Sequence, residues 1–327
     1  IGNSEAKTAL KKYADMLFLY DAKTKKNPIS ESTHIPRTVF MYARPGTGKT
    51  SIASAARNYM SGLSEKTGKK FSWVPIDSSI KKKWYGETEE ILKSKVEKAM
   101  NPDNIGVIFI DDIDGLVISR SDESSNAPDK SMTIYLMQLI EGIDTPYYGN
   151  YMIISASNKP GDLDDALIER IGEASFNVPG PKTKREYSEF LKIKLEKGIK
   201  SGYVRISENE WEKAAELCMK YSEELSPRDL TKAMRMLQDE ALKESALEGL
   251  CDLPYPEQKR RINLGFERIG INELAKAIEN RYHNEMSQRE VTYESEIKKI
   301  KESIVKEKKA IEIAAKELAE SEKNGNV

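Results

Sequence analysis

The stretch 38-TVFMYARPGTGKTSIASAARNYM-60 decides the fold of this chain. Its first part, 38-TVFMY-42, is apolar and typical of a buried strand, and 51-SIASAARNYM-60 is predicted to be a helix. The segment between them, 43-ARPGTGKT-50, follows the phosphate-binding pattern G-x-x-x-x-G-K-[ST], except that Ala43 replaces the first glycine. A strand, such a loop and a helix in this order predict a nucleotide-binding unit.

The loop has the chemistry of an anion site. Successive backbone N–H groups form a nest for phosphate oxygens, and the following helix adds the positive end of its dipole. Lys49 would reach the β- and γ-phosphates, and the Thr50 hydroxyl would bind magnesium. We therefore expect ATP and Mg²⁺ as cofactors, with nucleotide contacts from Pro45, Gly46, Thr47, Gly48, Lys49, Thr50 and Ser51. The alternative is a glycine-rich turn without a ligand, and Ala43 would be slightly strained if its φ were positive.

Short apolar runs alternate with helical stretches through the first half of the chain. We predict strands at 38-TVFMY-42, 71-FSWVPI-76, 106-GVIFI-110, 151-YMIISAS-157 and 175-SFNV-178. Helices are predicted between them at 51–60, 88–100 and 131–143. Continuously apolar strands indicate a sheet that is covered on both faces. The alternation with helices predicts an α/β fold with a doubly wound, parallel, five-stranded sheet.

The pattern changes after 179-PGPKTK-184, where no convincing strand follows. Helices are predicted at 185–199, 207–221, 226–244 and 271–283, with 249–261 as a looser connection. Ser207 and Ser226 are suited to the N-cap position, and Pro227 to the first helical position. We therefore predict three parts, which are a large α/β domain at 1–180, a helical lid domain at 181–283 and a charged C-terminal helix at 284–327.

The segment 284–327 is rich in Lys and Glu and carries widely spaced apolar residues. A heptad-like spacing relates Tyr293, Ile297, Ile300, Ile304, Ile311 and Leu318, and Glu307 interrupts it. A long helix is predicted, fraying at 324-NGNV-327. Coiled-coil pairing, docking on a neighbour and a weakly packed solvated helix all fit this pattern.

Three aspartates follow the predicted strand at 106–110, within 108-IFIDDIDGL-116. An unpaired buried carboxylate is costly, so these groups need a positive partner. With a phosphate-binding loop upstream, Asp111 would hold a hydrated magnesium ion. Asp112 would face the γ-phosphate and orient the attacking water. The alternative is that one aspartate caps the next helical turn, a role that suits Asp114.

The amino-acid composition argues against several classes of protein and of binding site. Lys and Arg number 52 against 53 Asp and Glu, so the net charge of −1 gives no general case for nucleic-acid binding. Two cysteines and two histidines form neither a disulfide framework nor a zinc-ligand set. No apolar run approaches the ~20 residues that span a bilayer, and no secretory signal opens the chain. We expect the cytoplasm or another reducing compartment, and a shortened or processed chain, because it begins at Ile1 without Met.

Six motifs occur in one order along the chain, and they resemble those of the AAA ATPases, a branch of the AAA+ superfamily. They are 1-IGNSEAKTALKKY-13, 43-ARPGTGKT-50, 83-KWYGETEE-90, 109-FIDDID-114, 120-RSDESSNAPDKSMTIYLMQLIEG-142 and 153-IISASNKPGDLDDALIER-170. The W-Y-G-E form is most similar to the katanin, spastin and membrane-protein-extracting branch. The resemblance implies that the backbone of Ile1 and Gly2 contacts adenine.

The resemblance also implies roles around the γ-phosphate. Asn158 matches sensor 1, which helps to place the lytic water, and Arg170 matches an arginine finger that reaches the neighbouring subunit. The usual second arginine is missing from 171-IGEASF-176. Arg228 takes the place of sensor 2. The alternatives are surface ion pairs, of Arg170 with Glu169 or Asp165 and of Arg228 with Asp229 or Glu224.

Asp112 departs from the Glu that the family usually has at this position. Its side chain is one methylene shorter, and misplacing a catalytic group by ~1 Å can cost ~100-fold in rate. The backbone could compensate, or hydrolysis could be slow by design.

The resemblance assigns Lys83, Trp84 and Tyr85 to a pore loop that grips an extended polypeptide, with 119–131 as a second pore loop. The alternative for the two aromatic residues is packing under the next helix. We expect a homo-oligomeric ring, a hexamer by resemblance, that unfolds or remodels polypeptides, with the C-terminal helix available to an adaptor. We expect no nucleic-acid partner and no transmembrane segment. Two other hypotheses are an AAA+ loader or initiator acting on nucleic acid and an ATP-binding scaffold with weak hydrolysis.

Overall fold

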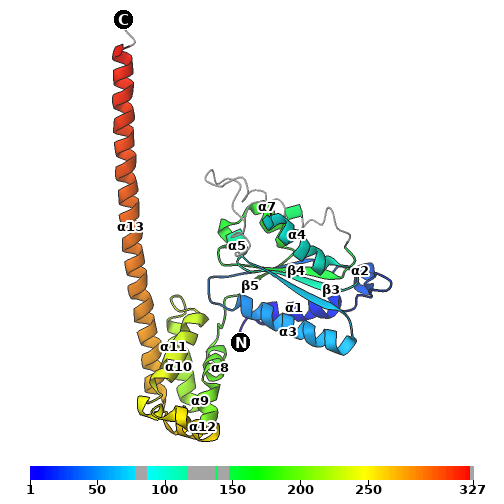
Figure 1. Cartoon of the computed structure of the whole chain (residues 1–327), viewed down its shortest axis with the longest axis vertical. Helices are drawn as coiled ribbons and strands as arrows, with labels where there is room; N and C mark the ends of the chain where they lie inside the picture. Colours follow the sequence, from blue (N-terminus) through cyan, green and yellow to red (C-terminus); the bar gives the residue numbers. More distant parts are fainter. Residues whose placement is uncertain (78–86, 117–136, 139–146, 325–327) are drawn as a thin grey trace. The chain divides into compact units, whose positions relative to one another are not determined.

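The computed structural model describes residues 1–77, 87–116, 137–138 and 147–324 (Figure 1). The chain forms two compact units. The first contains Ile1–Glu196 together with Ser226–Thr231, and the second contains Lys197–Leu225 together with Lys232–Val327. The predicted three-part division at residues 180 and 283 stays a prediction.

The first unit is built on one parallel sheet of five strands in the order β2-β3-β4-β1-β5. The strands are β1 (Thr38–Tyr42), β2 (Phe71–Ile76), β3 (Ile105–Ile110), β4 (Tyr151–Ser157) and β5 (Ala174–Asn177). Every residue of β3 and β4 is buried, which agrees with their continuously apolar sequences. The predicted doubly wound, parallel α/β fold is confirmed.

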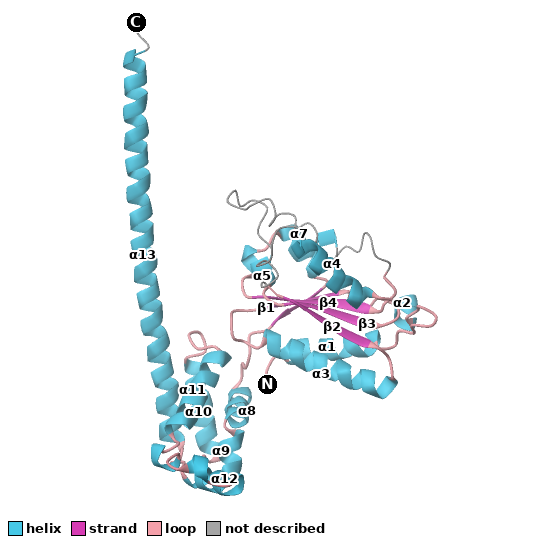
Figure 2. Ribbon diagram, in the orientation of Figure 1, coloured by secondary structure: helices cyan, strands magenta, loops and turns pink. Residues whose placement is uncertain are grey.

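Helices cover both faces of this sheet (Figure 2). On one face lie α1 (Ser4–Leu17) and α3 (Lys49–Thr67), and on the other lie α4 (Glu87–Met100), α5 (Ile113–Leu116) and α7 (Asp165–Ile171). Side chains of a strand alternate between the two cores, so Val107 packs on the α1–α3 side and Ile108 on the α4 side. Burying one such side chain contributes about 1.5–3 kcal/mol. The two cores together fix the strand register.

Smaller elements complete the first unit. They are α2 (Pro28–Ser32), the 3₁₀ turn η2 (Pro160–Asp162) and α8 (Lys184–Lys194). Helix α8 begins with a capping box in which the Thr183 Oγ1 accepts from the Glu186 N–H at 3.2 Å, and the Glu186 carboxylate accepts from the Thr183 N–H at 3.1 Å. A single helix was predicted at 185–199, but the chain breaks it at Leu195, and α9 (Glu196–Ser201) follows.

The second unit is all-helical in the part of the chain that the structure describes. It contains most of α9, then α10 (Glu208–Lys220), the 3₁₀ turns η3 (Glu244–Ala246) and η4 (Leu250–Asp252), α12 (Tyr255–Leu264) and α13 (Ile271–Asn324), with the later part of α11 (Pro227–Glu240). The segment 249–261 was predicted to be a looser connection. That prediction is wrong for its second half, because α12 begins there with Pro254 as its N-cap and Pro256 in its first turn, where a proline is tolerated.

Helix α13 is continuous over 54 residues. Near its start, Leu274 and Ile278 are fully buried, and Tyr282 stacks on Tyr221 next to the end of α10, with ring centroids 4.2 Å apart. From Ser287 to Ile304, by contrast, every residue is exposed except the half-buried Ile297. Because α13 continues to Asn324, the helical prediction for 284–327 is confirmed as far as that residue.

Candidate active site

Three loops meet at the carboxyl-terminal edge of the sheet. Strand β4 lies between β3 and β1 in the sheet, so the segments that leave these three strands are neighbours in space. The segments are the loop at Ala43–Thr50 after β1, Asp111–Asp114 after β3 and Asn158 after β4. Ligands of open α/β sheets bind in this position, outside the carboxyl ends of the strands.

The loop after β1 has the backbone that a phosphate site requires. Gly46 and Gly48 have φ values of 82° and 111°, which are in the left-handed region that favours glycine. Gly48 is the N-cap of α3 and has no side chain to occupy the N–H groups of the first turn. A Cβ at Gly48 would have no neighbour within 4 Å, so the backbone is open on that side. This arrangement fits a phosphate group.

Lys49 is buried in the first turn of α3. Its Nζ donates to the Ala43 carbonyl at 2.7 Å, to the Arg44 carbonyl at 3.2 Å and to the Asn158 Oδ1 at 2.7 Å. Burial lowers the pKa of Lys49, and the negative charge of Asp112 opposes this change most strongly. The ammonium therefore joins the loop after β1 to the end of β4.

Asn158 connects two parts of the site through the two atoms of its amide. Its Oδ1 accepts from Lys49, and its Nδ2 donates to the Asp112 Oδ1. Its backbone N–H donates to the Asp114 Oδ1 at 2.9 Å, which fixes the end of β4 against the segment after β3. Asp114 was the alternative candidate for a cap of the next helical turn, but its Oδ1 accepts from Asn158, the residue that follows β4.

Asp112 has a left-handed backbone, with a φ of 51°. Aspartate is among the few residues other than glycine that adopt this region with some frequency. In this conformation its short side chain contacts Asn158. Desolvation of the carboxylate raises the pKa of Asp112, and the negative charges of Asp111 and Asp114 raise it further, although the residue as a whole is exposed.

Thr50 and Asp111 form an oxygen pair beside this cluster. The Thr50 Oγ1 donates to the Asp111 Oδ2 at 3.0 Å. A hydroxyl and a carboxylate are hard ligands that suit Mg²⁺, which is usually held by one or two carboxylates and the phosphates of its substrate. Among the described residues, no group of three or more His, Cys, Asp or Glu is arranged to hold a metal. The pair fits a magnesium ion that takes its remaining ligands from phosphate and water.

Arg228 lies at the start of α11, next to the loop. Its backbone N–H donates to the Gly46 carbonyl at 3.1 Å. A Cβ at Gly46 would lie 2.6 Å from the Ser226 Oγ and 2.8 Å from the Arg228 Cβ, so only glycine allows this approach. The charge of Arg228 lowers the pKa of both Lys49 and Asp112. The guanidinium therefore acts electrostatically on the cluster.

Ile1 and Gly2 are held close to the same loop by Gly180. A Cβ at Gly2, whose φ is 70°, would lie 2.6 Å from the Gly180 carbonyl oxygen. The Asn3 Oδ1 accepts from the Gly180 N–H at 3.0 Å. A Cβ at Gly180 would in turn lie 3.6 Å from the Thr47 carbonyl oxygen. No role was predicted for Asn3 or Gly180, although the turn sequence 179-PGPKTK-184 offers a signal for Gly180.

Arg170 is in the last turn of α7, where its Nη1 donates to the Ala166 carbonyl at 2.8 Å. Glu173 lies in the segment where the family usually has a second arginine. The Glu173 carboxylate accepts from the Arg37 N–H at 2.7 Å and from the Thr38 N–H at 3.1 Å, and it also contacts His34. Glu173 therefore fixes the start of β1. The role of Arg170 toward a second subunit remains a prediction.

The predicted pore residues lie outside the described part of the chain. This applies to Lys83, Trp84 and Tyr85, and to 119–131. Among the described residues, no helix is both long enough and apolar enough to cross a bilayer.

Residues 39–178 match the family described as "ATPase family associated with various cellular activities (AAA)". The outer mitochondrial transmembrane helix translocase of Danio rerio is 32% identical over 174 residues, which cover 53% of this chain and 44% of that protein. A cell division cycle protein 48 homolog of Archaeoglobus fulgidus is 31% identical over 49% of this chain and 21% of its own length. The matches therefore span less than half of these relatives.

Solved structures agree on the fold. The crystal structure of the FIGL-1 AAA domain in complex with ADP aligns with a TM-score of 0.56 and 20% identity, covering 84% of this chain and 80% of that one. At this identity the likeness concerns the fold alone.

The comparisons correct two expectations. We expected a polypeptide as the substrate, and a location in the cytoplasm or another reducing compartment. Relatives from Danio rerio, Xenopus tropicalis and Homo sapiens are named for transmembrane helices and for the outer mitochondrial membrane, and these names overturn both expectations. The motifs, the parallel sheet and the family match agree on one identification, which is that residues 39–178 of this chain form an AAA domain.

Proposed function

We propose that this chain hydrolyses ATP and uses the energy, as a ring of subunits, to translocate polypeptides that include transmembrane helices. One observation carries the proposal. Lys49, Asn158 and Asp112 form a continuous chain of hydrogen bonds across three loops, beside the Thr50–Asp111 oxygen pair. The family match and the names of the relatives support the same function.

Each residue of the cluster has a distinct task in this proposal. Lys49 holds the phosphates, because its ammonium lies where the loop and the α3 N-terminus converge. Asp112 accepts a hydrogen bond from the attacking water, and Asn158 keeps the Asp112 carboxylate and the Lys49 ammonium in place. Thr50 and Asp111 hold the magnesium ion, which when bound neutralises charge on the phosphates. Arg228 supplies a further positive charge beside the loop.

The proposal places the nucleotide between subunits. Arg170 would reach the γ-phosphate held by the neighbouring subunit and stabilise the charge that develops during phosphoryl transfer. Lys83, Trp84 and Tyr85 would line the pore and move with the nucleotide state. The names of the relatives, which are transmembrane helix translocases, support the proposal of an apolar helix as the substrate class and a membrane surface as the place of action.

The first test is the steady-state ATPase rate with magnesium as a function of protein concentration. The rate per subunit should rise cooperatively, and Lys49→Ala and Arg170→Ala should each abolish it. Mixing the two variants should restore activity. In a mixed ring, some sites take Lys49 from an Arg170→Ala subunit and Arg170 from a neighbouring Lys49→Ala subunit, so both residues are present. Arg185→Ala is the matched control, since Arg185 is an exposed residue of α8 that pairs with Glu189. A mixture that stays inactive would show that Arg170 does not act across subunits.

A second test addresses the substrate. A protein with one transmembrane helix in a liposome should be extracted by the intact protein with ATP, and Trp84→Ala should lose extraction while it keeps ATPase activity. A protein that hydrolyses ATP normally but extracts nothing would refute the translocase proposal and leave the ATPase proposal standing.

The short side chain of Asp112 favours a second candidate function, which is an ATP-binding scaffold that hydrolyses ATP slowly. The family usually has the longer Glu at this position, so the carboxylate of Asp112 would lie further from the attacking water. A background ATPase rate together with ATP-driven assembly would support the scaffold and exclude the motor.

A further inference from the structure

The exposed part of α13 carries one apolar stripe. Tyr293, Ile300 and Ile304 are 65%, 59% and 46% exposed, and Ile297 between them is half-buried. Removing an apolar side chain of this size from water is worth about 1.5–3 kcal/mol. Isolated helices gain most of their stability from packing such a stripe against a partner. We therefore expect this stripe to pack against a partner surface.

The spacing of the stripe defines its geometry. The four residues follow one another at intervals of four, three and four, which is the 3.5-residue repeat of a coiled-coil seam. Tyr293 and Ile300 then occupy d positions, and Ile297 and Ile304 occupy a positions. The sequence continues the a series with Ile311 and Leu318. Glu290 falls on an a position and Glu307 on a d position, and both weaken the seam.

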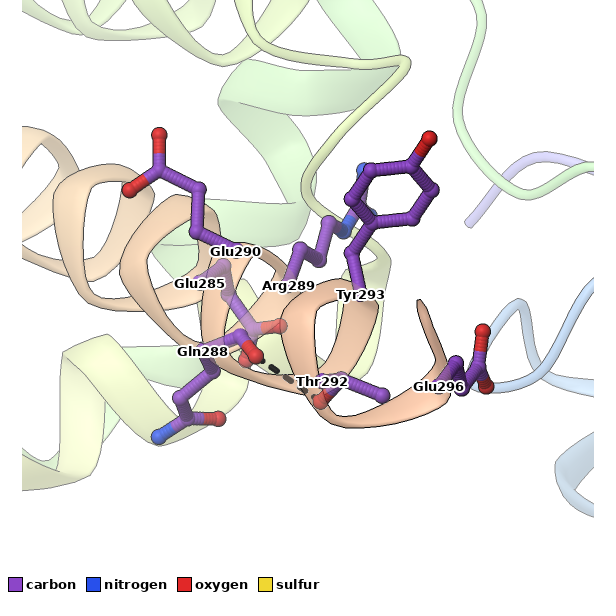
Figure 3. A pocket seen from close by; sticks show the side chains of 7 residues that line it. All are labelled: Glu285, Gln288, Arg289, Glu290, Thr292, Tyr293 and Glu296. Carbon is purple, nitrogen blue, oxygen red and sulfur yellow. Dashed lines mark hydrogen bonds between the residues drawn. The ribbon is translucent and has the colours of Figure 1, made fainter. Parts of the chain in front are cut away.

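The charges beside the seam identify the partner. In a parallel, in-register pair, each g residue faces the e residue five positions later on the other helix. Glu296 at g would face Lys301, and Arg289 at g would face Glu294, so both contacts are attractive between two identical helices. Figure 3 shows Arg289 and Tyr293 projecting from the same side of α13, as adjacent g and d residues must. Arg289 also donates to the Glu224 carbonyl at 2.8 Å, and a guanidinium has four further donors.

We propose that α13, from Arg289 to Ile304, pairs with the same segment of a second copy of this chain as a parallel, in-register coiled coil. A second copy of this chain supplies the opposite charge at both flanking contacts, so the charge pattern fits this chain as its own partner. The proposal uses no residue of the ATP site and stands or falls independently of it.

Charge exchange tests the proposal directly. In the full chain with Lys49→Ala, which disables nucleotide-driven assembly, Glu296→Lys places Lys at both 296 and 301, and Lys301→Glu places Glu at both. Each variant should self-associate at least about tenfold more weakly in analytical ultracentrifugation, and an equimolar mixture should recover the original affinity. Glu302→Lys makes the same charge change at an f position on the outer face and should leave the affinity unchanged.

Cysteine cross-linking tests the direction and register. In a Cys251→Ser background, Ile297→Cys and Ile304→Cys should each form a disulfide with the same position of a second chain. Circular dichroism of every variant should show an unchanged helix content, so that a loss of association is not a loss of folding. The proposal would be overturned by a parent chain that stays monomeric or by a charge-exchange mixture that does not recover. It would also be overturned if a mixture of the two cysteine variants formed cross-links only between positions 297 and 304.

Discussion

The Lys49 ammonium and the Asn158 side-chain oxygen lie 2.7 Å apart although 109 residues separate them in the chain. The contact joins the loop after β1 to the end of β4, and these two strands pair directly in the sheet. Because Asn158 also donates to Asp112, a displacement of any one of the three side chains reaches the other two. Residues in one such network have coupled effects on stability and activity.

Removal of the Asn158 side chain should lower the hydrolysis rate more than the affinity for ATP. Asn158→Ala deletes both the acceptor for Lys49 and the donor for Asp112, and removing one such positioned group costs about 10²–10³ in kcat. Steady-state ATPase kinetics should be measured beside binding of a fluorescent nucleotide. Asn104→Ala removes an amide that bonds to Ser72 and to the Lys98 carbonyl, so it is a suitable control. Equal losses in rate and affinity would contradict this role.

Asp112 should be the catalytic carboxylate at its present length. Asp112→Asn keeps the shape and the tolerance for a left-handed backbone but removes the negative charge, so ATP should bind while hydrolysis stops. Asp112→Glu adds a methylene to a side chain that already contacts Asn158, and Glu adopts the left-handed region less readily. We expect a rate loss of up to about 100-fold. A faster Glu variant would show instead that the short side chain limits the natural rate.

Two glycine substitutions should change stability in opposite directions. Gly62 lies inside α3, where a Cβ would meet no atom within 4 Å, so Gly62→Ala should stabilise the protein by about 0.5–1 kcal/mol. Gly46→Ala places a Cβ 2.6 Å from the Ser226 Oγ at a φ of 82°, so it should destabilise the protein and weaken nucleotide binding. Urea unfolding and ATP binding of both variants check this pair. A Gly46→Ala protein that is as stable as the parent would contradict the close approach of the loop and α11.

The two cysteines should react very differently with a thiol reagent. Cys218 is buried in α10, and burial raises the pKa of its thiol to about 12, so almost no thiolate forms near neutral pH. Cys251 is exposed. The native protein should therefore titrate one thiol quickly, and the unfolded protein two. Cys251→Ser should abolish the fast phase, and rapid reaction of a second native thiol would show that the α10 core opens readily.

Much of the candidate site could be predicted because its parts are local in sequence. The glycine pattern around Lys49 and the pair Asp111–Asp112 follow directly after apolar strands. The five strands agree with prediction to within one residue because continuously apolar runs allow little choice of boundary. The helix break at Leu195 and the helix α12 were missed, since both depend on packing that local propensity does not report.

The sequence by itself determined the parallel α/β fold, the order of the motifs and the residue types of the site, because periodicity and short motifs are local properties. Only the tertiary structure decided that Asn158 joins Lys49 to Asp112, that Asp114 holds Asn158, and that Glu173 fixes β1. It also decided that Asp112 has a left-handed backbone and that α13 exposes its seam. These relationships depend on which strands become neighbours and on which surfaces stay uncovered, and both follow from the packing of the whole chain.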